Sequence, residues 1–361
     1  MPEQHWEYVA VAGKRNGKPN FPPLNREQQK LIPAFDDALN VAAQSEVSHP
    51  IYSGYRVKES ISGLPAGNIS YGKKRALHGE EVAVANIYSK EGIVSASELP
   101  LILRNIATYN PAIALPKIIP NLILAIIAHD PDGMAKPCGN CLDLLRDKLG
   151  RSLNVVFGAS GGGEAKVAKL GDFLFEVGRE HRISLRAREG PNLIATLAGQ
   201  TFSEGTRLTD DAYVSKAEAL SRNYNALVVT NKGKYYGGYE CLCDYHPIYA
   251  GRDAIRQARR AHDYFLRYAL FTAPGPGNNP PDIMYMDRQH LMEYALIGDL
   301  ETGREGDKPV YLASIDPQRK AVTGLWQTSV REFLPFPFSP INFGEEFVSH
   351  FKEYYRRRKR F

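Results

Sequence analysis

Two short segments of this chain carry residue types that can hold a metal ion. His78 and Glu80 stand at the head of an apolar segment, and Cys138 and Cys141 follow Pro137 with two residues between them. One imidazole and two thiolates suit Zn²⁺ and leave its fourth position open for water, which zinc makes acidic enough to supply hydroxide near pH 7. A carboxylate two residues after the histidine can reach that water without being a ligand. We therefore predict one zinc ion per chain, with Glu80 beside it.

Other uses of these residues have to be weighed. A Cys-x-x-Cys pair also occurs in structural zinc sites and redox motifs. A closed structural site needs a fourth ligand, and the remaining cysteines, Cys241 and Cys243, have a poor chelate spacing. We expect them to be buried free thiols, and we expect His49 and His129 to be loop or core residues. The joint pattern of histidine, glutamate and two cysteines favours an open, catalytic site.

Both segments are expected to begin helices. The apolar pattern predicts a mostly buried helix from Leu77 to Tyr88 and a second helix from Cys138 to Leu149. At a helix N-terminus the positive end of the dipole stabilises a carboxylate or a hydroxide. Residues 89–120, rich in Leu, Ile and Pro, are interpreted as an insertion. Further segments are predicted as a helix at 26–44, an arm or irregular cap at 1–25, and strands at 52–57, 122–128, 154–157 and 165–170.

Composition limits the class of protein. The 361 residues suffice for two domains, and 43% hydrophobic with 24% charged residues is typical of a globular chain. The net charge of +5 owes much to the basic run 356–360, so it favours a nucleic-acid partner only weakly. No signal peptide is apparent, and the apolar run 112–128 is too short and too interrupted to span a membrane. Four cysteines in two close pairs do not indicate a disulfide framework, so we expect a cytoplasmic protein.

The two segments together resemble the His-x-Glu … Pro-Cys-x-x-Cys signature of zinc-dependent nucleoside and nucleobase deaminases. The resemblance to the cytidine deaminase family extends to residues 52–57, 68–72, 125–149 and 166–174. It implies a three-layer α-β-α fold, a central mixed sheet with helices on both faces. It also implies that a small, cytidine-like molecule is the substrate. The substrate contacts that we carry over are Tyr55, Asn68 and Pro137, whose carbonyl would receive the leaving amine.

The second half resembles the same family in degenerate form. Residues 225–238 are predicted to form a strand, a turn and a strand, and 245–254 resemble the zinc helix with Tyr249 and Gly251 in place of the ligand and the glutamate. Asp287 stands where a cysteine is expected, and residues 330–340 resemble the family's C-terminal motif. We therefore predict a duplicated α/β fold that pairs as a homodimer. Its predicted parts are an arm and helix at 1–50, a catalytic domain at 51–180 and a degenerate domain at 181–361.

The resemblance implies hydrolytic deamination, with Glu80 moving the protons; this step contributes about 10²–10⁴-fold. Glu81 is the competitor for that role, but on a helix it points about 100° away, which favours a supporting or solvated carboxylate. The family's Asn-x-Glu-Asn run reads Pro65-Ala66-Gly67-Asn68 here, so ribose hydroxyls would lose a charged acceptor.

The missing glutamate suggests that the reaction is kept and the substrate changed, to a modified nucleoside, a free base or a secondary-metabolite amidine. A deaminase of single-stranded nucleic acid would need a basic groove with aromatic platforms, for which the run 73–75 and the tail offer only charge. A non-catalytic scaffold is the third class. If the second copy contributes to the active site, the candidates are Glu240, Asp244 and Arg252.

Overall fold

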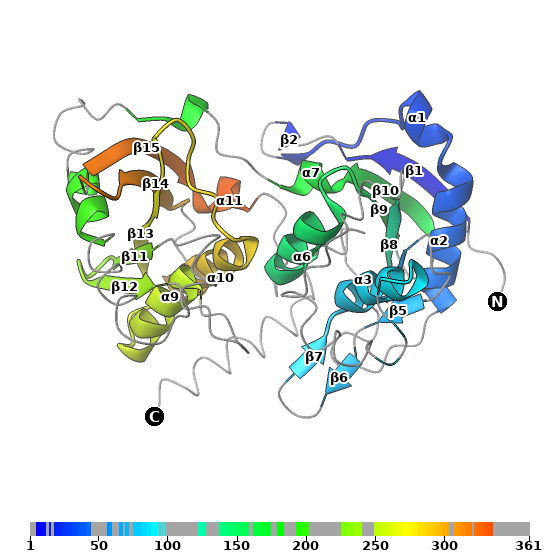
Figure 1. The fold of residues 1–361 in the computed structure, drawn as a ribbon, viewed down its shortest axis with the longest axis horizontal. Helices are drawn as coiled ribbons and strands as arrows, with labels where there is room; N and C mark the ends of the chain where they lie inside the picture. Colours follow the sequence, from blue (N-terminus) through cyan, green and yellow to red (C-terminus); the bar gives the residue numbers. More distant parts are fainter. Residues whose placement is uncertain are drawn as a thin grey trace. The chain divides into compact units, whose positions relative to one another are not determined.

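The computed structural model describes residues 5–11, 14–15, 18–44, 56–59, 65–67, 69–71, 75–93, 95, 97, 122–127, 137–158, 162–174, 179–183, 193–201, 225–239, 249–302, 307–319 and 321–334. These residues fall into two compact units. Unit 1 covers the described residues up to Leu174, and unit 2 covers those from 179 to 334. Each unit is a mixed α/β structure built on its own sheet (Figure 1). No helix among the described residues is long and apolar enough to cross a membrane.

The main sheet of unit 1 has the strand order β1-β10-β9-β8-β4-β5 among the residues described. Its strands in chain order are β1 (Trp6–Ala10), β4 (Arg56–Glu59), β5 (Pro65–Gly67), β8 (Ile123–Ile127), β9 (Asn154–Gly158) and β10 (Gly163–Lys169). The pairs β8–β9 and β1–β10 are parallel and the other pairs are antiparallel, so the sheet is mixed. Two small antiparallel pairs accompany it: β2 (Lys14–Arg15) with β3 (Lys18–Pro19), and β6 (Ile69–Tyr71) with β7 (Arg75–Leu77).

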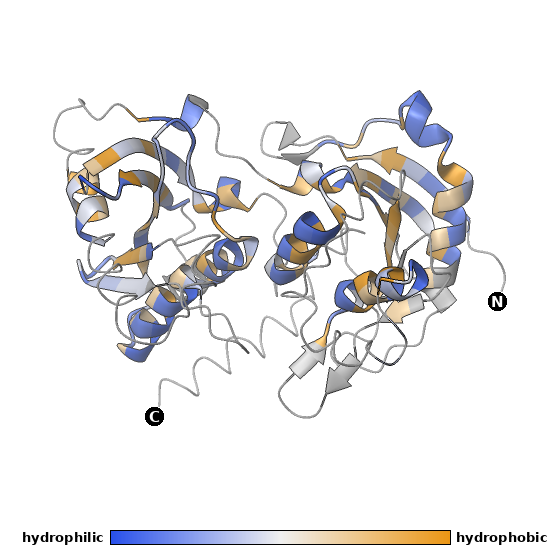
Figure 2. Ribbon diagram, in the orientation of Figure 1, coloured by the Kyte–Doolittle hydropathy of each residue, from blue (hydrophilic) through white to orange (hydrophobic). Residues whose placement is uncertain are grey.

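Helices cover both faces of this sheet. On β8, Ile123, Ala125 and Ile127 point to one face, where they pack in one cluster with Phe35 and Leu39 of α2 (Ile32–Gln44). The alternate residues of β8 are equally buried on the other face, on the side of α3 (Gly79–Lys90) and α6 (Gly139–Leu149) (Figure 1). A strand buried on both faces reads as a continuous apolar run. Figure 2 shows this for β8, which is hydrophobic along its length.

The helices predicted to begin near His78 and Cys138 and the strands predicted at 122–128, 154–157 and 165–170 are confirmed, with small shifts at their ends. The helix predicted at 26–44 is divided into α1 (Arg26–Gln29) and α2. Pro33 explains the division, because a proline ring clashes with the carbonyl four residues earlier, so proline is tolerated only in a first turn. Asn25 caps α1 by accepting hydrogen bonds from the backbone N–H groups of Glu27 and Gln28.

The N-terminal segment differs from the predicted arm. β1 joins the sheet beside β10, with Trp6 and Ala10 buried at 4% and 7% exposure. Tyr8 donates a hydrogen bond of 2.6 Å to Asp36 of α2, which fixes the strand to the helix as well as to the sheet. The burial of these residues, together with the pairing to a strand far along the chain, makes this segment part of the core of unit 1.

Among the described residues, unit 2 has the same order of main-sheet strands and helices as unit 1 has from α2 onward, without counterparts of β1, β2, β3, β6 and β7. Its sheet has the order β12-β11-β13-β14-β15, in which β13–β14 is parallel and the other pairs are antiparallel. The strands are β11 (Asn225–Thr230), β12 (Tyr235–Tyr239), β13 (Leu266–Pro274), β14 (Pro309–Asp316) and β15 (Ala321–Ser329). The helix at 193–201 packs on one face, and α9 (Ala250–Arg260) packs against β11 and β12 and contacts α10 (Tyr285–Thr302). A 3₁₀ turn, η1 (Arg179–His181), precedes these elements.

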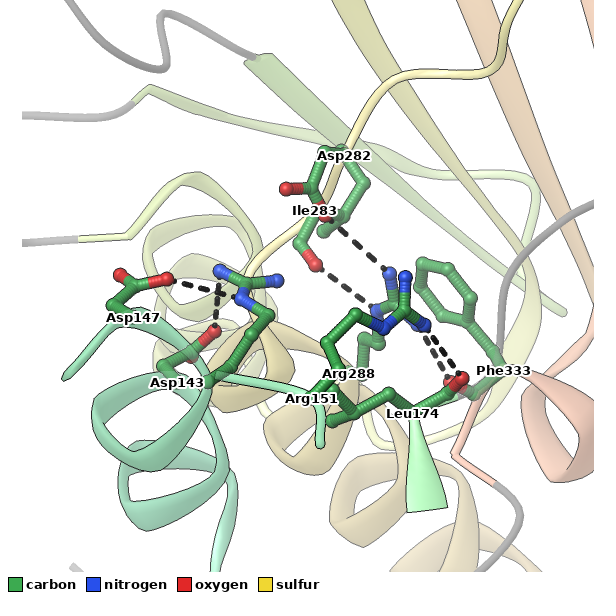
Figure 3. A network of polar contacts seen from close by, with 9 residues as sticks. Asp143, Asp147, Arg151, Leu174, Asp282, Ile283, Arg288 and Phe333 are labelled. Atoms are coloured by element: carbon green, nitrogen blue, oxygen red, sulfur yellow. Dashed lines mark hydrogen bonds and ion pairs between the residues drawn. The ribbon is translucent and has the colours of Figure 1, made fainter. Parts of the chain in front are cut away.

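In each unit an arginine holds the short helix that follows the last sheet strand. In unit 1, Arg151 Nη2 donates to the carbonyl of Leu174, just after α7 (Leu170–Phe173), at 3.5 Å (Figure 3). In unit 2, Arg288 of α10 donates to the carbonyl of Phe333 in α11 (Val330–Phe333) at 3.4 Å and to that of Ile283 at 3.0 Å. These bonds tie the last helical turn of each unit back to its own core.

Candidate metal centre

His78 lies at the N-terminus of α3, a helix that is buried on nearly every side. Because its sequence is apolar all round rather than striped, such a helix belongs inside a core. His78 is the N-cap and has an extended backbone, with φ −81° and ψ 154°. Its carbonyl accepts from Val82 N–H at 3.2 Å, which begins the helix. The imidazole is therefore presented from the end of α3, not from its side.

Cys138 and Cys141 stand in the same relation to α6. Cys138 is the N-cap, with φ −68° and ψ 166°, and Cys141 lies in the first turn. An N-cap side chain turns over the first turn of its helix, toward the third helical residue. The two sulfurs consequently meet at one end of α6, 3.5 Å apart, and both cysteines are free rather than joined in a disulfide. At the other end, Gly150 with φ 79° stops the helix, and its N–H donates to the carbonyls of Leu145 and Arg146.

The three side chains converge. His78 Nδ1 lies 3.3 Å from Cys138 Sγ and 3.2 Å from Cys141 Sγ. Tetrahedral zinc, with Zn–S near 2.3 Å and Zn–N near 2.0–2.1 Å, would hold such atoms about 3.6–3.8 Å apart. The observed triangle is a few tenths of an ångström tighter, so a small outward movement makes it fit. Among the described residues, these three form the group of side chains that could hold a metal ion.

Charge within the triangle is strongly coupled. A hydrogen bond from Cys141, followed by the charge of His78, lowers the pKa of Cys138 well below that of a free thiol. The Cys138 thiolate in turn raises the pKa of His78 to about 10. Burial raises the pKa of Cys141 well above its usual value. The Cys138 thiolate and a positive charge on His78 therefore favour one another within the triangle.

Two carboxylates lie in the first turn of α3, beside the triangle. Glu80 and Glu81 are 1% and 6% exposed. Both contribute to the raised pKa values of His78 and Cys141, so both are close enough to act on the site electrostatically. Glu81 also accepts a hydrogen bond of 2.8 Å from the backbone N–H of His78. The helix dipole favours both charges at this position.

Of the residues predicted to bind substrate, only Pro137 lies in the part of the chain that the structure describes, buried directly before Cys138. Of the second-half candidates, Arg252 is described and lies exposed in the first turn of α9 (Ala250–Arg260). Eight further residues singled out in the sequence lie outside the described ranges: Tyr55, Asn68, His49, His129, Glu240, Cys241, Cys243 and Asp244. The bond from His78 N–H to Glu81 was missed at the sequence level. Its signal was present, since an N-cap residue followed three positions later by Glu is the spacing of a capping box.

Unit 2 has a different group at the ends of its two corresponding helices. α9 and α10 precede and follow β13 as α3 and α6 precede and follow β8. Tyr249 is the N-cap of α9, and Asp287, with no exposed surface, accepts hydrogen bonds from Gly251 N–H at 3.0 Å and from Arg252 N–H at 2.8 Å. A Cβ atom on Gly251 would lie 2.9 Å from the Asp287 carboxylate, so that approach requires glycine. A buried carboxylate here links the two helices.

Comparisons with known proteins add little. No family model and no curated protein matches the sequence. Among solved structures, the chain is similar to a crystal structure of cytidine deaminase from Burkholderia pseudomallei at 18% sequence identity; the match covers 40% of this chain and 98% of that one, with a TM-score of 0.30. A similarity at that TM-score carries no argument, so the proposals below rest on the geometry of the site.

Proposed function

We propose that the chain is a zinc-dependent hydrolytic deaminase of small cyclic amidines, with a cytidine-like molecule as the first substrate class to test. The observation that carries this is the convergence of His78, Cys138 and Cys141 from two helix N-termini, with buried Glu80 in the same turn as the histidine. A structural zinc site would need a fourth protein ligand, which the cluster of described residues does not supply. A dithiol redox pair could use the histidine to stabilise a thiolate, but it would not by itself require the buried carboxylate of Glu80.

The proposed reaction needs residues that bind the metal and a residue that transfers protons. His78, Cys138 and Cys141 would hold zinc, which activates a water molecule at neutral pH when bound. Glu80 would be the group that moves protons at this site, to the ring nitrogen and to the exocyclic amine of the substrate. The net reaction would add the oxygen of one water molecule to the amidine carbon and release the amine as ammonia. The buried position of Glu80 keeps bulk water from competing for these protons.

We further propose that unit 2 is a degenerate copy of unit 1, whose core includes β1 and α2 in addition to the predicted domain 51–180. The shared order and orientation of five strands support this, as does the position of α9 and α10 around β13. Asp287 would then occupy the position of a cysteine ligand of unit 1, and Gly251 would occupy the position of Glu80. On this proposal only unit 1 binds zinc, and a homodimer would contain two zinc ions.

The test is a paired measurement on the purified full-length chain: zinc per chain, and ammonia release from cytidine, deoxycytidine, cytosine and cytidine monophosphate. One zinc with release from at least one of these supports the proposal, and rapid release from cytidine would refute the argument from the missing glutamate. One zinc with no release directs the search to modified nucleosides and other amidines, and release from none of those would refute the deaminase. Absence of zinc would refute the metal centre itself.

A further inference from the structure

The main chain of His78 is held on both sides by its own helix. Its N–H donates to Glu81 Oε2 at 2.8 Å, and its carbonyl accepts from Val82 N–H at 3.2 Å. Glu81 is 6% exposed, so its bond to His78 is shielded from competition with water. Hydrogen bonds to a charged acceptor are shorter and stronger than those between neutral groups. The backbone of a metal-ligand candidate is thus fixed by residues three and four positions further along.

This contact is the half of a capping box in which the third helical residue reaches back to the N-cap backbone. It gives the start of α3 a partner for the His78 N–H, while Nδ1 of the same residue faces the two sulfurs at 3.2 and 3.3 Å. With the peptide groups on either side held, only the two side-chain torsions of His78 have to be set for its Nδ1 to face the sulfurs.

We propose that Glu81 is the positioning residue for His78: its carboxylate fixes the main chain of the ligand so that Nδ1 points at the metal. The proposal rests on the metal centre proposed above. It assigns different roles to two adjacent carboxylates, with Glu80 moving protons and Glu81 holding the ligand. Hydrogen-bonding partners that orient metal ligands typically change metal affinity 10–100-fold when removed.

The experiment measures zinc affinity of the full-length protein by competition with a chelator, and the visible absorption of the Co²⁺-substituted protein. We expect Glu81→Ala to bind zinc about 10-fold more weakly and to shift the cobalt bands, because the imidazole loses its fixed orientation. Glu81→Gln should restore much of both, since its amide oxygen can accept the same N–H. Glu91→Ala, at the exposed C-terminal end of α3, is the matched control and should leave both unchanged.

A residue that only stabilised the helix would give a different result. It would lower the melting temperatures of the metal-free and metal-loaded protein alike and leave zinc affinity and the cobalt spectrum unchanged, and that outcome overturns the proposal. If Glu81→Ala does not fold, Glu81→Asp keeps the charge but shortens the reach; wild-type zinc affinity in that variant overturns the proposal equally. Neither readout involves a substrate, so failure of the deaminase assay is distinguishable from failure here.

Discussion

At the scale of single residues, the two carboxylates of α3 show how neighbours on a helix acquire different surroundings. Both are buried and both raise the pKa of His78 and Cys141, but Glu81 also accepts a hydrogen bond from the backbone N–H of His78. A carboxylate that already holds the main chain of a ligand is poorly placed to carry protons to a substrate. Under the proposed function, Glu80 is therefore the carboxylate that we expect to transfer protons.

Replacing Glu80 with Gln tests that assignment. The change removes the proton-carrying group and nearly preserves volume, so we expect kcat to fall about 10²–10⁴-fold while zinc remains at one per chain. The measurement is ammonia release alongside metal content, with Glu91→Gln as the exposed control on the same helix. A Glu80→Gln protein with wild-type turnover would move the proton-transfer role to another residue.

The sequence was sufficient to predict the metal triangle because its members lie at helix N-termini that the apolar pattern already indicates. His78 begins an apolar run, and Pro137 marks the start of the cysteine helix. For Glu81 the sequence favoured a supporting or solvated carboxylate but did not name its partner, because the bond to the N–H of His78 depends on His78 being the N-cap of α3. Side-chain charge states were equally out of reach: the pKa of His78 rises because Cys138, 60 residues away in the chain, lies 3.3 Å from it.

At the scale of elements, local pattern predicted helices and buried strands but not the edge of the first sheet. β1 has only five residues, of which Trp6 and Ala10 are buried, and its partner β10 is distant in the sequence. No local signal reports such a parallel pairing. The division of the predicted 26–44 helix could have been predicted from Pro33, because proline is tolerated only in the first turn of a helix.

Tyr8 connects β1 to α2, and its removal should weaken that connection. Burial first, and then the hydrogen bond to Asp36, raise the pKa of Tyr8 well above that of a free tyrosine. The folded state thus requires the neutral phenol, so its contribution is present below about pH 10 and is lost as the pH rises above that value. We expect Tyr8→Phe to lower the free energy of unfolding by about 1 kcal/mol at pH 8.

Above pH 10 the difference between the two proteins should shrink, because the wild type alone loses the contribution of this phenol. Urea unfolding at pH 8, 9, 10 and 11 measures it, with Tyr235→Phe, an exposed tyrosine of β12, as control. A difference that stays constant across this range would contradict the assignment.

The helix pair of unit 2 offers a second element-level prediction. Gly251→Ala should cost about 1–3 kcal/mol, because its Cβ would lie 2.9 Å from Asp287 Oδ1 and 3.1 Å from Phe271 Cε1. Asp287→Ala should cost a similar amount, since two buried N–H groups lose their acceptor. The double variant should be less destabilised than the sum, by about 0.5 kcal/mol or more, because the methyl group then meets a smaller neighbour. Strict additivity in urea unfolding would show that the two positions do not interact.

At the scale of the whole molecule, the two units link their helix pairs by different groups. Unit 1 brings a histidine and two cysteines together at the ends of α3 and α6, and unit 2 places a carboxylate against the first-turn amides of α9. If unit 1 binds zinc as proposed, its arrangement would depend on the metal supply, whereas that of unit 2 would depend only on the chain. Loss of metal should therefore affect the units unequally.

Hydrogen exchange of the full-length protein with and without a chelator measures this difference. We expect removal of zinc to raise exchange in the first turns of α3 and α6, because metal binding is linked to local folding. Exchange in α9 and α10 should stay within error. Re-addition of zinc supplies the control, and an equal increase in both helix pairs would contradict independent stabilisation.

The parallel pairing of β1 with β10 also means that β1 is synthesised well before the strand with which it pairs. Trp6 pairs with Gly163, and at about 5–20 residues per second the first strand is made roughly 8–30 s before its partner. Until then β1 lacks its pairing strand. The indole of Trp6 also lacks its packing partner, because Gly158, against which it packs, is synthesised only shortly before β10. The nascent chain therefore cannot complete unit 1 from its beginning, and the segment made first is among the last to find its place.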